Sequence, residues 1–274
     1  MSGSKIDPEV FNRAFRERVA EVYGDTSGKG ALDDRQLFYL EMLAQIDAFQ
    51  KGKHLVDLAP GLTAFGPIAA VMGMKVTLID DYGGGGGVDV NRREVAMKIV
   101  NGFRDKLGVR IEEMDFLTRP LPMPDASVDA ITCFHSLEHW HNSPKPLFRE
   151  IIRVLKPGGH LIIATPNAVN LRKRLLLPFG MTNYGALEEW YHDGDPVYRG
   201  HVREPIVRDL QRLMEWNGLE VRATYGRNFI GKASNSLSFI PRPLMSFIAT
   251  SVDLVIRFFP TLCSDIHVIG RKPA

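Results

Sequence analysis

Three histidines and a glutamate carry side chains that could move a proton. His135, Glu138 and His139 fall within five positions of one another, and His201 lies 62 residues further on. An imidazole titrates near neutral pH, so it can act as a general base toward a hydroxyl group. Zinc binding through the three histidines is an alternative, although their spacing matches no zinc signature.

A second group of residues has the types and the spacing of a nucleoside-binding turn. The stretch 56–66, VDLAPGLTAFG, contains Gly61, and Asp80 follows 19 residues later. Glycine lets a ligand approach the backbone closely, and a carboxylate at a strand tip can accept both ribose hydroxyl hydrogens. A dinucleotide-binding turn would also need glycines at positions 59 and 64, which are alanines here. A nicotinamide oxidoreductase is therefore disfavoured, and a plain buried strand–helix turn stays open as an alternative.

These residues must be positioned by an alternation of short apolar runs and helical segments. The runs typical of strands are 54–59, 75–80, 109–114, 128–134 and 160–165, and the helical segments between them are 64–73, 91–106 and 144–155. Strand–helix alternation predicts an α/β fold with a parallel sheet, helices on both faces and ligands at the carboxyl ends of the strands.

The flanking segments predict a division into two parts. Residues 1–50 read as two helices that form a packing or lid element ahead of a main domain, 51–274. Within that domain, 166–260 is expected to hold insertions that form the substrate pocket. The remaining predicted elements are a helix over 205–217 and strands over 219–225 and 266–270.

The composition is that of an ordinary globular protein. The chain has 274 residues, of which 45% are hydrophobic and 24% charged, and its net charge is +2. This balance gives no sign of a basic nucleic-acid-binding surface. Two cysteines, Cys133 and Cys263, exclude a disulfide framework and a four-cysteine zinc site. The first ten residues do not resemble a signal peptide, so we expect a cytoplasmic protein.

Two longer motifs carry a resemblance to a known family. DAITCFHSLEHW (129–140) and RVLKPGGHLIIATPN (153–167) resemble the core of the class I S-adenosylmethionine-dependent methyltransferases, of type 11. The resemblance extends over about residues 50–225. The first motif of that family normally reads D-x-G-x-G-x-G, whereas this sequence keeps Asp57 and Gly61 but has Ala59 and Thr63 at the outer glycine positions.

The resemblance implies a Rossmann-like, seven-stranded sheet and S-adenosylmethionine as the cofactor. It also implies roles at the strand ends: a turn that shapes the cofactor site, an acid that binds the ribose, and a pair of residues beside the adenine. The residues implied to bind the cofactor are Asp57, Ala59 and Gly61 in the turn, Asp80 at the ribose, Asp115 and Phe116 beside the adenine, and Phe134.

The resemblance also implies an in-line displacement that moves a methyl group to an acceptor. The segments 165–180, 188–191 and 198–204 are similar to bacterial methyltransferases that modify sugars, polysaccharides or lipid-linked glycans. We therefore expect O-methylation of a carbohydrate, a polysaccharide precursor or a related small molecule. The catalytic residues expected are His139 as the general base, His201 as the second candidate or a substrate ligand, and His135 on the same rim.

No metal is expected at this rim. Some members of the family bind magnesium through E-x-x-E-H, and here His135 replaces the first acid of that motif. An imidazole is a poor ligand for a hard cation that prefers oxygen.

Other functions and partners stay open at this point. Ala59 and Thr63 leave room for a protein that binds S-adenosylmethionine without catalysis, for instance as a scaffold, and the acceptor could instead be phenolic or linked to a lipid. The segment 241–260 is apolar but too short and too charged to span a bilayer. It is expected to be a buried helix or the contact of a homodimer, with an interfacial helix that touches the membrane surface as the alternative. No nucleic-acid partner is expected.

Overall fold

The structure is a computed structural model. It describes residues 8–24, 34–45, 48–82, 90–180, 187–192, 198, 200–228, 251, 255–256 and 258–274. The chain divides into two compact units. Unit 1 contains residues 1–134, 142–161 and 272–274, and unit 2 contains residues 135–141 and 162–271.

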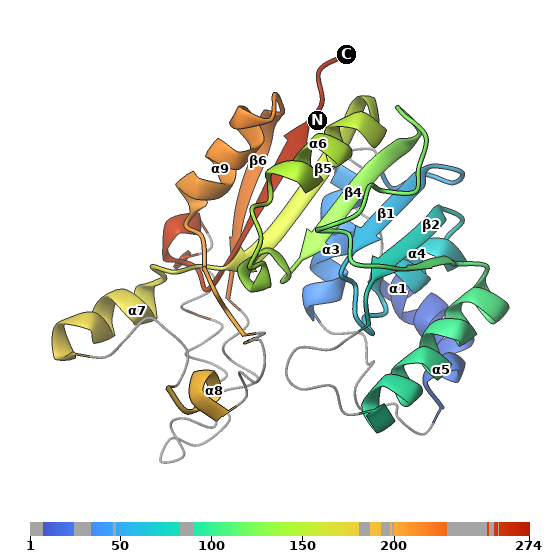
Figure 1. Cartoon of the computed structure of the whole chain (residues 1–274), viewed down its shortest axis with the longest axis horizontal. Helices are drawn as coiled ribbons and strands as arrows, with labels where there is room; N and C mark the ends of the chain where they lie inside the picture. Colours follow the sequence, from blue (N-terminus) through green and yellow to red (C-terminus); the bar gives the residue numbers. More distant parts are fainter. Residues whose placement is uncertain are drawn as a thin grey trace. The chain divides into compact units, whose positions relative to one another are not determined.

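Within the described residues, the strands form a seven-stranded sheet in the order β3-β2-β1-β4-β5-β7-β6 (Figure 1). The strands are β1 (His54–Leu58), β2 (Lys75–Asp80), β3 (Arg110–Glu113), β4 (Val128–Phe134), β5 (Leu155–Pro166), β6 (Glu220–Arg227) and β7 (Asp265–Arg271). β1 pairs in parallel with β2 and β4, β2 pairs in parallel with β3, and β6 pairs antiparallel with β7. The predicted Rossmann-like α/β fold is confirmed.

The strand order places the switch point of the sheet between β1 and β4. From β1 the chain runs to β2 and β3 on one side and then returns to β4 on the other. In open α/β sheets, ligands bind at the carboxyl ends of the strands beside such a point. The residues that follow Leu58 of β1, Asp80 of β2 and Phe134 of β4 are therefore the first place to look for a site.

The helices of unit 1 include two groups, one at the N-terminus and one between the strands. They are α1 (Pro8–Ala14), the π-helical turn η1 (Phe15–Val19), α2 (Ala20–Tyr23), α3 (Asp34–Gln45), α4 (Phe65–Val71), α5 (Val90–Leu107) and α6 (Lys145–Val154). Tyr23 ties the N-terminal helices to the rest of the unit, because its ring lies edge-on to Phe103 of α5 and its hydroxyl donates to the carbonyl of Leu62 (2.9 Å). Gly66 lets α4 lie close to β2, since a Cβ there would come within 2.6 Å of Leu78 Cδ2.

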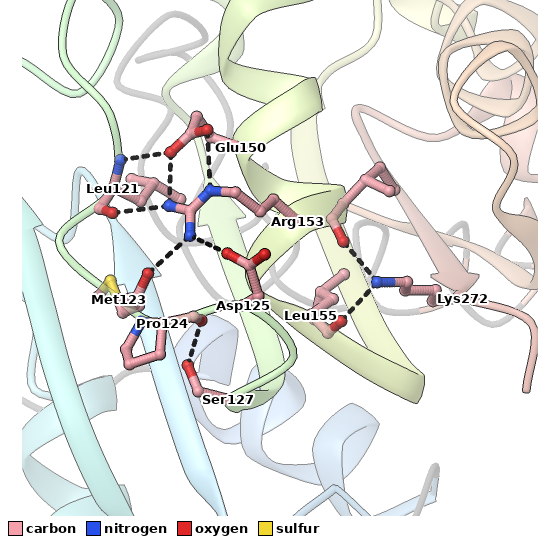
Figure 2. Close-up of polar contacts among 10 residues, drawn as sticks. Leu121, Met123, Pro124, Asp125, Ser127, Glu150, Arg153, Leu155 and Lys272 are labelled. Carbon is pink, nitrogen blue, oxygen red and sulfur yellow. Dashed lines mark hydrogen bonds and ion pairs between the residues drawn. The ribbon is translucent and has the colours of Figure 1, made fainter.

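Arg153 of α6 holds the loop that leads into β4. Its guanidinium donates to the carbonyls of Leu121 (2.9 Å) and Met123 (2.8 Å) and pairs with Glu150 and Asp125 (Figure 2). Glu150 and Asp125 raise the pKa of Arg153 further above its usual range. The arginine of the sequence motif RVLKPGG therefore has a structural role at this loop.

β5 is longer at its start than the sequence predicts. The expected strand begins at His160, whereas β5 begins at Leu155 and includes the Pro-Gly-Gly segment. The amide of Gly158 donates to the carbonyl of Lys272 (2.9 Å), and the amide of Lys272 donates to the carbonyl of Gly159 (2.8 Å). Pairing with a segment more than a hundred residues away thus draws the predicted turn into the strand.

Unit 2 consists of short helices together with β6, β7 and the last part of β5. Its helices are η3 (Leu137–His139), α7 (Leu171–Leu176), η4 (Leu177–Phe179), α8 (Leu187–His192), α9 (Val207–Trp216) and η6 (Pro260–Leu262). α9 buries Leu210 and Met214 and contacts both β6 and β7. Buried Asn167 ties η6 to the end of β5, because its amide donates to the carbonyls of Thr261 (3.1 Å) and Cys263 (2.9 Å).

The predicted apolar helix over 241–260 falls largely outside the described residues. Among the residues that the structure does describe, no helix has the length and the hydropathy needed to cross a membrane.

Candidate functional site

Asp57 lies at the buried base of the turn that follows β1. Its Oδ1 accepts a hydrogen bond from the hydroxyl of Thr132 on β4 (2.6 Å), the strand paired with β1. Burial raises the pKa of Asp57 to about 7, the negative charge of Asp80 adds to this rise, and the bond from Thr132 opposes it. The carboxyl therefore joins the two central strands below the turn.

Asp80, the last residue of β2, is held by two backbone amides. Its Oδ2 accepts from the amide of Gly61 and its Oδ1 from the amide of Tyr82, both at 2.9 Å. Burial raises the pKa of Asp80, and the two amide bonds oppose that rise. Each oxygen has a further lone pair, so the carboxylate could accept the two hydroxyl hydrogens of a ribose.

The turn that directly follows β1 has two residues in the left-handed region. Ala59 has φ 54° and Gly61 has φ 55°. Gly61 takes this conformation without strain, and a Cβ built on it would meet no atom within 4 Å in the part of the chain that the structure describes. Ala59 adopts the conformation that favours glycine at the position where the family has glycine, and its amide donates to the carbonyl of Ile79 (2.8 Å). Ala59 thus adopts a positive φ in this turn although it carries a Cβ.

The end of β3 lies beside Asp80 and leads to Asp115 and Phe116. The amide of Met114 donates to the carbonyl of Asp80 (3.0 Å). Asp115 is exposed, and its carboxylate accepts from the amide of Leu117 (2.9 Å) and the hydroxyl of Thr118 (2.8 Å), while Phe116 is buried. The placement beside β2 agrees with the expected adenine side, and the contact with adenine stays a prediction.

Phe134, at the end of β4, belongs to an aromatic group that sequence reasoning found only in part. Its ring stacks on Tyr39 of α3 (centroids 3.8 Å apart, planes at 20°) and lies edge-on to Phe65 of α4 (5.2 Å). Tyr39 sits in the segment expected to be a packing or lid element, and no motif marks it. Thr132 was also missed, although a threonine in an otherwise apolar strand is a usable signal.

The two histidines favoured as bases come together in unit 2. The rings of His139 on η3 and His201 lie edge-on with their centroids 4.8 Å apart. Glu138, the residue before His139, is buried, and its Oε1 is 4.0 Å from His201 Nε2. Glu138, His139 and His201 each offer one ligand atom, and these three atoms all lie within 4.8 Å of one another. The three residues, called the histidine–glutamate cluster below, could therefore hold a metal ion.

Glu204 supports His201 and was not singled out from the sequence. His201 Nδ1 lies 2.8 Å from Glu204 Oε1, and Lys173 of α7 pairs with the other oxygen. The hydrogen bond with Glu204 raises the pKa of His201, burial opposes this, and the charge of Glu138 adds to it. Burial pushes the pKa of Glu204 upward, but the bonds from His201 and Lys173 outweigh it, so the pKa falls below its usual value. Glu204 follows His201 by three positions, which is a local signal that could have marked it.

His135 lies between Glu138 of the cluster and Asp265 of β7, with one ring nitrogen toward each. It has φ 50°, its Nδ1 is 3.7 Å from Glu138 Oε1, and its Nε2 is 3.5 Å from Asp265 Oδ1 of β7. The seven predicted cofactor residues thus lie in unit 1 and the three predicted histidines in unit 2. The covalent chain joins the two sets at Phe134 and His135.

Comparisons with known proteins agree with this strand order and these motifs. A family model described as a methyltransferase domain matches residues 77–163. A probable S-adenosylmethionine-dependent methyltransferase of Mycolicibacterium smegmatis is 33% identical over 39% of this chain and 34% of its own length. A demethylmenaquinone methyltransferase of Symbiobacterium thermophilum is 29% identical over 58% of this chain and 60% of its own length. The chain thus spans less than two thirds of either relative.

A solved structure gives the same fold. The S-adenosylmethionine-dependent methyltransferase of Mesorhizobium loti superposes with a TM-score of 0.50 over 83% of this chain and 96% of its own, at 17% identity. The matched segment contains Asp80, whose carboxylate accepts a hydrogen bond from Gly61 in the turn after β1. Residues 77–163 match the methyltransferase domain family, and the chain has the fold of the S-adenosylmethionine-dependent methyltransferases.

Proposed function

We propose that the protein transfers a methyl group from S-adenosylmethionine to a hydroxyl oxygen of a carbohydrate or a related small molecule. The observation that carries the choice of oxygen is the pairing of His201 with Glu204 beside His139. A hydroxyl is a weak nucleophile until it loses its proton, so its methylation calls for a positioned proton acceptor.

In this proposal the cofactor is bound by the turn after β1 and by Asp80. The two amides that hold Asp80 fix the direction of its carboxylate before any ligand arrives. Holding the sulfonium and the acceptor in line supplies much of the rate enhancement of such a displacement. The sheet edge of unit 1 therefore acts mainly by positioning.

We assign His139 as the proton acceptor and His201 as its helper or as a ligand of the substrate. The bond with Glu204 raises the pKa of His201, so His201 is protonated to a larger extent near neutral pH than an ordinary histidine. A protonated imidazole can donate a hydrogen bond to the acceptor but cannot take its proton. This argument favours His139 for the proton transfer.

The proposal is tested by a methyl-transfer screen with S-adenosylmethionine labelled with ¹³C in its methyl group. Sugars, glycolipids and phenols serve as acceptors, and the product is identified by NMR, which separates methyl carbons bound to oxygen, nitrogen and carbon. Labelled O-methyl product is the expected result. Product labelled only on nitrogen or carbon would overturn the choice of oxygen while leaving the cofactor assignment intact.

The role of His139 is tested by single-turnover methylation with His139→Ala. We expect the rate to fall by 10²- to 10⁴-fold, about the contribution of a general base. His192→Ala is the matched control, because His192 is an exposed histidine on α8 of the same unit. An unchanged rate for His139→Ala at neutral pH would exclude His139 as the base.

A protein that binds the cofactor without catalysis is the first alternative, motivated by Ala59 and Thr63. Titration with S-adenosylhomocysteine while the unfolding temperature is measured separates the cases in two steps. A ligand that binds the native state must raise the apparent stability, so the absence of a shift at millimolar ligand would contradict cofactor binding altogether. A shift without product in the screen would favour the scaffold.

A phenolic or lipid-linked acceptor is the second alternative. The relative from Symbiobacterium thermophilum is named for the methylation of demethylmenaquinone, and this chain matches 60% of its length. The screen therefore includes a quinol, and a methyl group found on its ring carbon would favour this alternative over a carbohydrate.

A further inference from the structure

Glu138 stands out because it is a buried carboxylate without a hydrogen-bond donor. Its side chain is 1% exposed, and among the described residues neither of its oxygens has a hydrogen-bond partner. His135 Nδ1 lies 3.7 Å and His201 Nε2 lies 4.0 Å from Glu138 Oε1. Both distances are longer than a hydrogen bond. Burial of a carboxylate is costly unless a charge or donors compensate it, so this position calls for a cation.

The distances in the histidine–glutamate cluster fit a shared ion better than direct contacts. Zinc binds imidazole nitrogen and carboxylate oxygen at about 2.0–2.2 Å, so two tetrahedral ligands of one ion lie about 3.4 Å apart. Glu138 Oε1 and His201 Nε2 are 4.0 Å apart, and all three ligand atoms lie within 4.8 Å of one another. Movements of a few tenths of an ångström to about one ångström would bring them to ligand distance.

His201 is oriented as a metal ligand usually is. Its Nδ1 is bonded to Glu204 Oε1 (2.8 Å), so Nε2 is the nitrogen that faces Glu138. A histidine that binds a metal commonly donates its other N–H to a carboxylate in this way, which fixes the tautomer and the ring direction. Lys173 pairs with the second oxygen of Glu204 and holds that carboxylate in turn.

The backbone also brings the two halves of the cluster together. The carbonyl of Glu138 accepts from the amides of Val202 (2.7 Å) and Arg203 (3.2 Å). These two bonds join the segment that carries His201 to the one that carries Glu138 and His139. Backbone hydrogen bonds therefore hold the ligand residues near one another without an ion.

We propose that Glu138, His139 and His201 bind one divalent transition-metal ion of the zinc type. Two imidazoles and one carboxylate suit such an ion, whereas magnesium and calcium prefer oxygen ligands. This differs from the expectation of no metal, which rested on His135 in place of an acid, because His201 supplies the ligand that the local motif lacks. His135 is not needed as a ligand, since its Nε2 faces Asp265.

Three protein ligands leave at least one position open for a water or a hydroxyl oxygen. The ion would lower the pKa of a hydroxyl bound at that open position, which would make methylation of the hydroxyl easier. This consequence rests on the proposed function, whereas binding of the ion does not. With an ion bound, the proton of the hydroxyl would pass to water, and His139 would be a ligand of the ion; the role of His139 as the base assigned above applies to the metal-free protein.

Binding is tested without cofactor or acceptor by calorimetric titration of the chelator-stripped protein with Zn²⁺. We expect one ion per chain with a dissociation constant in the micromolar range or below. Glu138→Gln and His201→Ala should weaken binding at least 100-fold, and Glu204→Gln should weaken it 10- to 100-fold, as changes behind a ligand do. His192→Ala, the exposed control on α8, should leave it unchanged, and Mg²⁺ should not compete.

Co²⁺ provides a readout that does not depend on any variant folding. Titration of the wild-type protein with Co²⁺ should give the visible absorption bands of a site with fewer than six ligands, and Zn²⁺ should abolish them. Absence of these bands, no binding of Zn²⁺ below the millimolar range, or equal binding by wild type and folded His201→Ala would each overturn the proposal.

Activity after metal removal separates this proposal from the proposed function. If the stripped protein binds Zn²⁺ as expected but methylates equally well without it, the site stands and its catalytic consequence is wrong. If no methyl transfer occurs under any condition while Zn²⁺ binds with the stated variant pattern, the proposed function fails and the metal site remains.

Discussion

Replacing Gly61 by alanine separates the stability of the cofactor turn from its access to ligand. Gly61 has φ 55°, a conformation that costs an L-residue about 1 kcal/mol. A Cβ at this position would contact no atom of the described residues within 4 Å, so no clash with them adds to that cost. The amide that donates to Asp80 Oδ2 is retained in the variant. We therefore expect Gly61→Ala to lower the free energy of unfolding by only about 1 kcal/mol.

The effect on ligand binding should be larger. The open space over Gly61 is where the turn would let a nucleoside approach, and a methyl group would occupy that space. We expect the dissociation constant of S-adenosylhomocysteine to rise at least tenfold, which corresponds to about 1.4 kcal/mol. A stability loss of about 1 kcal/mol leaves a protein of ordinary stability folded at 25 °C, so it cannot itself produce this change.

Calorimetric titration with S-adenosylhomocysteine and chemical denaturation measure the two effects on the same samples. Ala59→Gly is the matched control, because Ala59 has nearly the same φ, 54°, and the substitution removes a Cβ in place of adding one. It should keep or improve the affinity, and its stability should change by less than about 1 kcal/mol, since relief of strain is offset by greater freedom of the unfolded chain. An unchanged affinity in Gly61→Ala would refute the assignment of this turn to the cofactor.

Three further variants test the contacts that position the two sets of site residues. Burial holds the pKa of Asp57 near 7, above its ordinary 3.8, so between these pH values the folded wild type binds more protons than the unfolded chain. The stability of the wild type relative to Asp57→Asn should therefore fall by up to about 4 kcal/mol as the pH rises from 4 to 8. Denaturation at a series of pH values measures this fall, and a constant difference in stability would contradict it. Arg153→Lys should lose about 2 kcal/mol in chemical denaturation, because the three donors of an ammonium cannot replace the five hydrogen bonds of the guanidinium. Arg104→Lys, at an exposed pair with Asp105, should leave the midpoint unchanged. Asn167→Ala should cost about 3 kcal/mol, roughly one for each bond of the buried amide to Thr261, Cys263 and Val169, and a loss below about 1 kcal/mol would argue against the role of Asn167 in holding η6.

The strands were predictable where a compact apolar run is bounded by turn residues. β4, Val128–Phe134, has the predicted bounds, because its core of apolar residues is fully buried and its flanks are polar. The start of β5 was not predictable, because it depends on pairing with Lys272, a contact that leaves no local pattern. Local periodicity reports burial along one element, and it does not report which distant segment completes a ladder.

The site residues divide in the same way. Gly61 and Asp80 could be predicted as site residues because their spacing follows directly from a strand, a turn and a second strand. Asp57 was predicted from the resemblance to the first motif of the family. Thr132 bonds Asp57 across 75 positions, and Tyr39 stacks on Phe134 from a separate helix. Such partners come from tertiary packing, so a single sequence without a motif at those positions cannot mark them.

Three of the four strained residues that are not glycine follow strands at the sheet edge where the site was expected. The structure records four residues other than glycine with positive φ in its described ranges: Ala59, Tyr82, Ala126 and His135. Ala59 follows the end of β1, Tyr82 comes two residues after the end of β2, and His135 follows the end of β4. Such conformations cost about 1–3 kcal/mol each and persist where surrounding contacts impose them, often at functional sites.

The backbone amides of these three residues all donate hydrogen bonds near the predicted site residues. The amide of Tyr82 donates to the carboxylate of Asp80, and the amide of Ala59 donates to the carbonyl of Ile79 near the end of β2. His135 begins the segment that carries Glu138 and His139, and its amide donates to the carbonyl of Ala164 on β5 (2.8 Å). Three neighbouring strands therefore end beside strained residues, next to the predicted cofactor turn, the predicted ribose acid and the histidine–glutamate cluster. If the strain serves only to close these turns, Ala59→Gly and His135→Gly should each leave ligand binding unchanged. If it positions the ligand groups, His135→Gly should weaken Zn²⁺ binding even though His135 is not a ligand, and titration with Zn²⁺ decides between these outcomes.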